Sequence, residues 1–272
     1  MKDVQSTTDK RGIHINQVGV SDLRYPITVL DKTNKPQATV GTFSLSVDLP
    51  HHFKGTHMSR FVEVLNECHG EVTLRTVPVL LKKLQKRLEA ARTHVAVEFT
   101  YFIKKAAPVS GAEALVSLNC AFIAEANGAK DDFLLRVEVP VTSLCPCSKE
   151  ISDYGAHNQR GFLTFTVRSK RDRKGNWQFI WIEELVDLAE KSASAPIYAL
   201  LKRTDERFVT MQAYDNPVFV EDMVRNAAGL LNKDKRVAWY EVRAVNQESI
   251  HNHSAFAVVS SPNAPRRSSP RS

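Results

Sequence analysis

The sequence predicts an α+β protein with largely antiparallel strands, built from two similar halves. In each half, strand-like and helical segments follow in the order strand, strand, helices, strand, strand. This order favours hairpin-paired strands with the helices on one face of the sheet. Strands and helices do not alternate one by one, and no glycine-rich phosphate loop is present, so a doubly wound parallel sheet is not expected.

The first half is expected to contain four strands and two helices. Apolar side chains mostly alternate along 38–49, as they do in a strand with one buried face. Apolar residues at helical spacing mark both helices, and the second has Pro78 in a suitable first-turn position. The strands are expected near 26–31 and over 38–49, 94–104 and 114–125, and the helices over 57–69 and 78–92.

The second half repeats this order with an additional helix. Its strands are expected over 132–142, 161–169, 236–245 and 253–260, and its helices near 182–191, 195–203 and 217–231. A sheet of four strands leaves two unpaired edges unless another element covers them. Joining the halves, and then joining subunits into a closed ring or barrel, would remove these edges, so we expect an oligomer.

These patterns suggest four segments along the chain. We expect an N-terminal arm over 1–24, a first unit over 25–127, a second unit over 128–260 and a basic tail over 261–272. The tail, SPNAPRRSSPRS, is rich in Ser, Pro and Arg, a composition typical of disorder.

The composition is that of an ordinary globular protein, with 43% hydrophobic and 25% charged residues. No apolar run approaches the roughly 20 residues of a membrane helix, and the N-terminus lacks the apolar region of a signal peptide. A cytoplasmic location is therefore expected. The net charge of +7 suggests an anionic partner, although the arginines of the tail supply part of it. A small phosphorylated ligand suits this charge at least as well as nucleic acid.

The four cysteines do not suggest disulfides. Cys145 and Cys147 are separated only by Pro146, which makes a bond between them geometrically awkward. Cys68 and Cys120 lie within apolar patterns and are expected to be small hydrophobic residues of the core.

The segment CPCSKEISDYGAH brings Cys145, Cys147 and His157 close together in sequence. A closed structural zinc site needs four Cys or His ligands in paired knuckles, which this chain does not supply locally. A catalytic metal site needs only three protein ligands, and one of the cysteines with His157 would supply two. A structural or incidental role for the pair stays open at this point.

A second cluster, ESIHNHSAF, places His251 and His253 just before the last expected strand. Alternate residues of an extended segment point to the same side, so the two imidazoles could share one face and bind a transition metal. Two exposed histidines at the start of a strand are the plainer interpretation. An HNH-type nuclease is discounted, because that motif leads into a helix.

Acidic and basic clusters complete the candidate residues. Asp205 and Glu206 lie in KRTDERFVT, and Glu221 and Asp222 fall within the first turns of an expected helix, where acids favour the helix dipole. The basic side chains are surface charges in the plainer interpretation. Together with hydroxyls and a helix start they would form a phosphate cradle. The cradle residues are Lys54, Arg60, Lys104, Lys105 and Ser110.

Seven blocks together are more specific than any one cluster: INQVGVSDLRYPI, KGTHMSRF, KKAAPVSG, PVTSLCPCSKEISDYGAHNQRG, YALLKRTDERFVT, NPVFVEDMVR and ESIHNHSA. In this order they closely resemble GTP cyclohydrolase IB, the prokaryotic metal-dependent enzyme at the entry to folate synthesis. The resemblance runs from about Ile15 to Ser260.

The resemblance implies a tunnelling fold with two tandem units per subunit, a homotetramer, and hydrolysis of GTP to 7,8-dihydroneopterin triphosphate and formate. It also implies a zinc or manganese ion, with the second unit carrying most of the site. The ligands carried over from the family motifs are Cys145, His157, Glu206 and His251. Thr204 stands where some relatives have proline, a loop change that leaves the ligand itself in place.

The resemblance assigns further roles beside the metal. Cys145 counts among the catalytic residues, with Cys147 and His253 as candidates for outer-sphere or proton-transfer work. Glu221 matches the carboxylate that accepts hydrogen bonds from the N1–H and 2-amino groups of guanine, with which it would select against adenine. No nucleic acid or membrane partner is expected.

Two alternatives remain at the level of sequence. One is another tunnelling-fold enzyme, such as the nitrile reductase of queuosine synthesis, which uses a catalytic cysteine and NADPH. The other is a non-catalytic protein that binds nucleic acid and contains a structural zinc.

Overall fold

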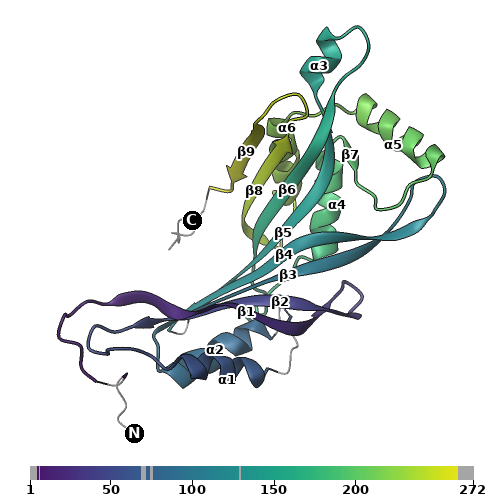
Figure 1. Ribbon diagram of the computed structural model, residues 1–272. Helices are drawn as coiled ribbons and strands as arrows, with labels where there is room; N and C mark the ends of the chain where they lie inside the picture. The colour runs from purple at the N-terminus through teal and green to yellow at the C-terminus, as the bar shows by residue number, and fades with distance from the viewer. Residues whose placement is uncertain (1–4, 6, 69–71, 74–75, 129, 263–272) are drawn as a thin grey trace. The chain divides into compact units, whose positions relative to one another are not determined.

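The computed structural model describes residues 5, 7–68, 72–73, 76–128 and 130–262. In this part of the chain, nine strands and six helices follow one another (Figure 1). The strands are β1 (Ile15–Leu30), β2 (Pro36–Leu49), β3 (Arg92–Ala106), β4 (Glu113–Asn127), β5 (Lys130–Leu144), β6 (Asn158–Ser169), β7 (Ala195–Pro196), β8 (Val237–Gln247) and β9 (Ser254–Ser260). The helices are α1 (Met58–Asn66), α2 (Val77–Leu88), α3 (Pro146–Ile151), α4 (Ile182–Ser192), α5 (Arg203–Asp215) and α6 (Val220–Leu231).

The strands form one hydrogen-bonded path in the order β1-β2-β3-β4-β5-β6-β8-β9, and β7 pairs with β5 beside this path. The pairs β1–β2, β2–β3, β5–β7, β6–β8 and β8–β9 are all antiparallel. The predicted α+β class with antiparallel strands is therefore confirmed.

The chain divides into two compact units. The first comprises residues 1–100 and 120–135, and the second comprises 101–119 and 136–272. Three strands, β3, β4 and β5, contribute residues to both units. These units divide the chain differently from the tandem halves expected at 25–127 and 128–260, and the tandem halves stay a prediction. Residues 263–272 of the expected basic tail lie outside the described residues.

In the first unit, α1 and α2 cover one face of the sheet formed with β1 and β2 (Figure 1). Alternation along β2 turns Phe43 and Leu45 inward, where both are almost completely buried. They join Phe61 of α1 and Leu81 and Leu84 of α2 in one apolar core. Burying each such side chain contributes roughly 1.5–3 kcal/mol, so this interface fixes the helices on the sheet.

The strand expected near 26–31 is longer than predicted, because β1 begins at Ile15. Its pairing with β2 shifts register between Ile15 and Val18 and again between Val20 and Leu23. Asp22, between these segments, has a positive φ of 59°. The shifts interrupt the alternation of apolar and polar residues. For this reason the sequence predicted an arm and not a strand over residues 15–24.

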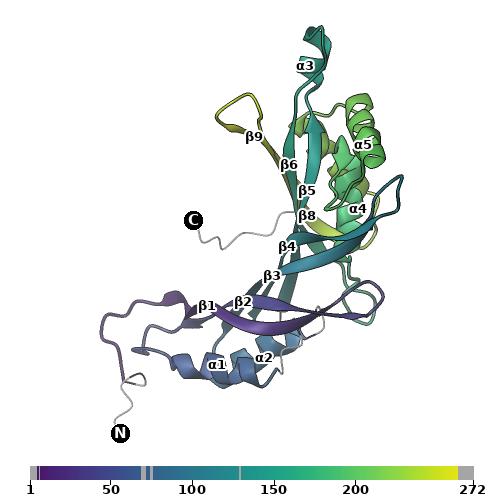
Figure 2. The ribbon, with the colours of Figure 1, turned by 45° about the vertical axis from the view of Figure 1, so that its right-hand side comes forward.

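In the second unit, α4 and α6 pack against each other, and α6 also contacts β8 and β9. Leu185 of α4 and Met223 of α6 are completely buried, and β6 contributes Leu163 and Phe165 to the same core. Figure 2 shows α3 projecting beyond the ends of β5 and β6. Among the described residues, no helix is long and apolar enough to cross a membrane.

The prediction of a helix near 195–203 is wrong. Ala195 and Pro196 instead form β7 against Val141 and Thr142 of β5, and the helix α5 begins only at Arg203. Proline lacks an N–H group and cannot sit inside a regular helix, although it is tolerated in a short edge strand. The apolar spacing around this proline therefore reflects a buried edge strand and not a helical face.

Candidate metal and substrate site

Cys145 lies at the junction of β5 and α3. It is half-buried, and its Sγ atom lies 3.5 Å from the amide N of Ser148, from which it accepts a hydrogen bond as the cap of α3. Its own amide donates to the carbonyl oxygen of His157 at 3.1 Å. The loop after α3 therefore folds back and holds the two residues next to each other, while Cys147 is exposed.

His157 is fixed from two directions just before β6. Its amide donates to the hydroxyl of Ser148 at 3.2 Å, and its Nδ1 atom lies 3.1 Å from the hydroxyl oxygen of Ser249. Ser249 belongs to the loop between β8 and β9, which also carries His251. The structure thus brings the segments of three predicted ligands together, and the contact at Nδ1 leaves Nε2 of His157 available for a ligand.

His251 and His253 lie in that same loop, before β9 begins at Ser254. Both are exposed, and their rings stack with centroids 5.0 Å apart and an interplanar angle of 15°. The two imidazoles lie side by side, as predicted, although an irregular loop places them and not a strand.

Glu206 is exposed in the first turn of α5. Helical spacing puts it on the same face as Val209, Thr210 and Ala213. These three residues line an open pocket of about 430 Å³, together with Thr142, Asn158, Gln159, Arg160, Gln247 and Ser249. The helix face that carries Glu206 therefore lines a polar pocket. The wall of this pocket includes Ser249, the residue that contacts His157.

The donor set fits a borderline divalent metal. One thiol, two imidazoles and one carboxylate suit zinc and related ions. Metal-binding histidines commonly engage a polar group through the second ring nitrogen, as His157 does with Ser249. Within the described residues, however, no three Cys, His, Asp or Glu side chains lie close enough to hold one ion. The assignment of Cys145, His157, Glu206 and His251 as ligands stays a prediction.

Glu221 lies exposed in the first turn of α6. The segment before this helix is held firmly, because the amide of Val218 donates to the Leu144 carbonyl and its own carbonyl accepts from the Ser143 hydroxyl, both at 3.1 Å. Asn246 in turn donates to Ser143 at 3.0 Å. The chain is therefore held in place just before Glu221, and the role of Glu221 as the guanine anchor stays a prediction.

The expected phosphate cradle is divided between the two units. Lys54 and Arg60 belong to the first, where Arg60 lines an open pocket of about 610 Å³ with Lys83, Lys86 and Arg87. In the second unit, Lys104 pairs with Glu113. Lys105 is more strongly held, by Glu190 at 2.5 Å and the Ile197 carbonyl at 2.6 Å. The hydroxyl of Ser110 donates to Asp205 at 2.6 Å.

These contacts change the expectation for two residues. Lys105 and Ser110 already have strong partners inside the protein, so a phosphate would have to displace them. Lys54 is exposed, Arg60 is partly exposed, and Lys104 pairs only at the surface. These three side chains are the better placed of the predicted contacts to bind an anion from solvent.

Comparison of the chain with known proteins decides its family. A family model described as type I GTP cyclohydrolase folE2 matches residues 1–257. The chain belongs to this family. The chain is 52% identical to the GTP cyclohydrolase FolE2 of Nitrosococcus oceani over 259 residues, which cover 95% of this chain and 94% of that protein. It is also 52% identical to the FolE2 of Syntrophus aciditrophicus, over 95% of this chain and 99% of that one.

Solved structures support the fold of this folE2 family member. The uricase from Arthrobacter globiformis matches with a TM-score of 0.55 and 9% identity, covering 94% of this chain and 96% of its own. The urate oxidase from Bacillus subtilis 168 matches with a TM-score of 0.53 and 8% identity, over 90% and 98% of the two chains. The predicted tunnelling fold is confirmed by these similarities, which at this identity concern the fold alone.

The sequence did not point to the polar lining of the pocket beside His157. Gln159 is nearly buried there, donates to Glu248 at 3.2 Å, and has a side-chain oxygen without a hydrogen-bond partner among the described residues. Ser249 and Thr210 were missed as well. They are common residue types with no motif of their own, and only the approach of α5, β6 and β8 gives them a shared role.

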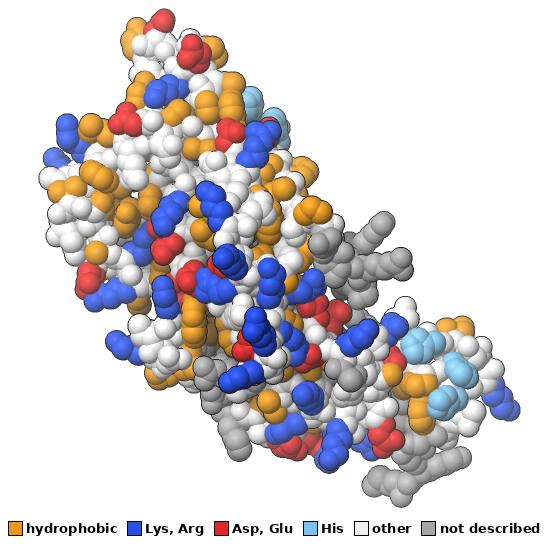
Figure 3. Space-filling view, turned by 180° about the vertical axis from the view of Figure 1, so that it is seen from behind, with side chains coloured by type: hydrophobic (Ala, Val, Ile, Leu, Met, Phe, Trp, Pro, Cys, Tyr) orange, Lys and Arg blue, Asp and Glu red, His pale blue; other side chains and the backbone are white. Residues whose placement is uncertain are grey.

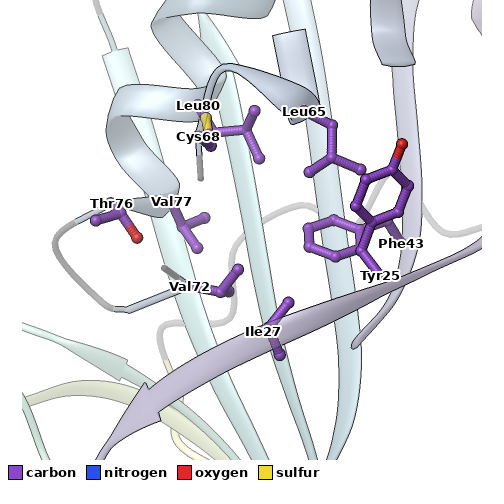
Figure 4. A pocket seen from close by; sticks show the side chains of 9 residues that line it. All are labelled: Tyr25, Ile27, Phe43, Leu65, Cys68, Val72, Thr76, Val77 and Leu80. Atoms are coloured by element: carbon purple, nitrogen blue, oxygen red, sulfur yellow. The ribbon is translucent and has the colours of Figure 1, made fainter. Parts of the chain in front are cut away.

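The two remaining cysteines are structural, as predicted. Cys120 is buried, and Cys68 reaches into a small apolar pocket beneath α1 and α2, lined by Tyr25, Ile27, Phe43, Leu65 and neighbours (Figure 4). Burial raises the pKa of the Cys68 thiol above its ordinary value of 9.0. A thiol held neutral in this way is a poor nucleophile and a poor metal ligand.

Proposed function

We propose that the protein hydrolyses GTP to 7,8-dihydroneopterin triphosphate and formate, the first step of tetrahydrofolate biosynthesis, and that it is of subtype IB. The observation that carries this proposal is the match of residues 1–257 to the type I GTP cyclohydrolase folE2 family. Curated relatives named GTP cyclohydrolase FolE2 support it with 50–52% identity over nearly their whole length.

A divalent ion, zinc or manganese, would be held by Cys145, His157, Glu206 and His251. When bound, such an ion supplies Lewis acidity and lowers the pKa of a coordinated water toward neutrality. The hydrogen bonds around Cys145 and His157 hold two of these donors in place before any ion binds. Preorganisation of this kind reduces the cost of assembling a site from distant parts of the chain.

Proton transfer falls to the residues beside these donors. Opening the imidazole ring of guanine and releasing formate requires a proton to leave the attacking water and another to reach a ring nitrogen. His253, stacked on His251, is the first candidate for these roles. The exposed thiol of Cys147, two positions after Cys145, is the second candidate.

Guanine recognition falls to Glu221. A carboxylate accepts hydrogen bonds from both the N1–H and the 2-amino group of guanine, whereas adenine offers neither donor in that arrangement. The triphosphate requires positive charge, and Lys54, Arg60 and Lys104, the more accessible of the predicted contacts, are the proposed contributors.

A homotetramer completes the proposal. The strands β1 and β9 lie at the two ends of the sheet path, and β9 exposes Phe256 and Val258. An exposed apolar edge strand invites pairing with another chain. We further propose that the enzyme is cytoplasmic, where GTP is available.

Metal-stripped protein tests the function. Adding back zinc or manganese separately should restore formate release from GTP, and failure of every divalent ion to do so would refute the proposal. Consumption of NADPH would favour the nitrile reductase instead. Salt-sensitive binding of DNA or RNA without any effect of GTP would favour a binding protein. On the face in Figure 3, Lys and Arg side chains are interspersed with Asp and Glu, which does not favour that outcome.

A further inference from the structure

Asp205 lies one residue before Glu206 in the first turn of α5, and its side chain is completely buried. Its Oδ1 atom accepts hydrogen bonds from the amides of Val109 and Ser110, each at 2.8 Å. Its Oδ2 atom accepts from the Ser110 hydroxyl at 2.6 Å and from the Lys202 amide at 2.8 Å. A carboxylate offers about four acceptor positions, so this one is saturated.

These bonds satisfy the buried carboxylate from two separate segments of the chain. The amides of Val109 and Ser110 and the Ser110 hydroxyl come from the segment between β3 and β4, and the Lys202 amide comes from the start of α5. A buried charge is tolerated only when its hydrogen-bonding capacity is satisfied in this way. The interaction is therefore a built feature of the fold and not an incidental surface contact.

The loop over 107–112, between β3 and β4, is shaped to receive this carboxylate. Gly111 has a positive φ of 68° and donates to the Ala107 carbonyl at 3.1 Å, while the Ala107 amide donates to Ala112 at 2.9 Å. The turn closes on itself and leaves the successive amides of Val109 and Ser110 directed at one acceptor. Successive amides arranged in this way form an anion-binding concavity, and here Asp205 occupies it.

The same carboxylate closes the first turn of α5. That turn is ordinarily the least restrained part of a helix, because its amides lack partners within the helix. Here the Lys202 amide donates to Asp205, and the Glu206 amide donates to the Lys202 carbonyl at 2.9 Å. The backbone of Glu206 is thereby fixed, and only its side chain is free to rotate.

The opposite end of α5 is also held. The Nζ atom of Lys149 in α3 donates to the Tyr214 carbonyl at 2.5 Å and lies 4.2 Å from the centre of the Tyr214 ring. Because α3 begins next to Cys145, this contact links the helix of one predicted ligand to the helix of another. With its end anchored, α5 depends on its first turn to set where Glu206 lies.

We propose that Asp205 is a positioning residue for Glu206, which ties the start of α5 to the 107–112 loop and so holds the Glu206 carboxylate where it reaches the metal. The inference rests on the proposed function, because the role of Glu206 as a ligand belongs to that proposal. Ser110 then acts through Asp205 and does not contact the triphosphate.

The substitution Asp205→Asn tests this directly. Asparagine keeps the size and one acceptor, but it loses the charge and turns an amide group toward the donor of Lys202. Zinc affinity of the full chain, measured by competition with a fluorescent chelator, should fall about 10–100-fold, as it does when groups that orient metal ligands are lost. The turnover number kcat should fall with it, while KM for GTP stays near the wild-type value.

A matched control is Asp172→Asn. The Asp172 carboxylate also accepts hydrogen bonds from backbone amides, those of Lys174 at 2.8 Å and Asn176 at 2.9 Å, but it does so in a separate turn of the chain. This variant should bind zinc like the wild type. A similar loss in both variants would attribute the effect to general destabilisation and overturn the inference.

A milder variant decides the matter if Asp205→Asn does not fold. Ser110→Ala removes one of the four hydrogen bonds and leaves the three that backbone amides donate. The positioning role predicts weaker zinc binding and lower kcat at unchanged KM, whereas contact with the triphosphate predicts a raised KM at unchanged zinc affinity. Wild-type zinc affinity in the folded Asp205→Asn protein, or in Ser110→Ala, would overturn the inference. Wild-type protein that binds zinc but releases no formate would instead overturn the proposed function.

Discussion

The Nδ1 atom of His157 lies 3.1 Å from the hydroxyl oxygen of Ser249. This contact joins the start of β6 to the loop between β8 and β9, two segments that are 92 residues apart in the chain. A hydrogen bond at Nδ1 sets the ring orientation and the nitrogen that faces the metal.

Ser249→Ala should therefore weaken metal binding without abolishing it. The imidazole keeps its backbone position through the His157 amide, but it loses the partner that orients the ring. We expect about a tenfold loss of zinc affinity, at the lower end of the range for such residues. Zinc titration of the purified variant measures this, and an unchanged affinity would show that Ser249 does not orient a ligand.

Cys145→Ala and His251→Ala should each abolish metal binding and activity together. The proposed ligands come from distant parts of the chain, so the loss of one opens the site. Metal content and formate release, measured on the same preparation, provide the test. His253→Ala is the matched control, since it removes the stacked neighbour and should retain the metal while turnover falls. Full metal content with normal turnover in Cys145→Ala would refute the ligand assignment.

Glu221→Gln should retain the metal and lose catalysis. An amide would present a donor to the donors of bound guanine, a mismatch that costs roughly 1–3 kcal/mol and lowers kcat/KM about 5–150-fold. If Glu221 only complements the helix dipole, the change costs a few tenths to about 1 kcal/mol of stability and leaves kcat/KM intact. Metal content, melting temperature and GTP kinetics distinguish these outcomes.

Neutralising the basic residues should distinguish the more accessible cations from Lys105, which is held inside the protein. Lys54→Gln, Arg60→Gln and Lys104→Gln should raise KM for GTP, more at low than at high salt, because screening weakens exposed charges. Lys105→Gln should instead lower the melting temperature, since it leaves Glu190, only 20% exposed, without its cation. Kinetics at two ionic strengths test this set, and an unchanged KM in the first three variants would place the triphosphate elsewhere.

His94 should make the stability of the protein depend on pH. Burial lowers the pKa of His94 below its ordinary 6.5, and the partial compensation by Glu125, 3.8 Å away, does not restore it. Below about pH 6.5 the unfolded chain binds a proton that the folded chain does not, so stability falls as the pH falls. His94→Gln should flatten this slope of melting temperature between about pH 5 and 7. An equally steep slope without His94 would contradict the assignment.

Much of the fold could be predicted because most of its elements carry a clear period. The alternation along β2 and the helical spacing in α1 and α6 follow directly from which faces are buried. β1 and α5 could not be predicted in the same way. Register shifts conceal the alternation of β1, and α5 has few buried residues to give it a period.

The candidate site shows the same division. Cys145, His157 and His251 stand in motifs that suggest chemistry on their own, and the structure places their segments next to one another. The supporting role of Asp205 depends on amides of the 107–112 loop, about 95 residues earlier in the chain. A long-range interaction with a backbone leaves no mark on the identity of the loop residues that make it, so sequence alone does not reveal it.

The passage of β3, β4 and β5 through both compact units bears on how the polypeptide could be divided. A cut after residue 127 would leave the first fragment with residues 101–119, which belong to the second unit, and the second fragment with 130–135, which belong to the first. Each fragment would carry strand segments whose packing partners lie on the other. The two fragments are therefore suited to complementation, in which they fold only when mixed, and limited proteolysis of the intact enzyme should not release either one as a stable domain.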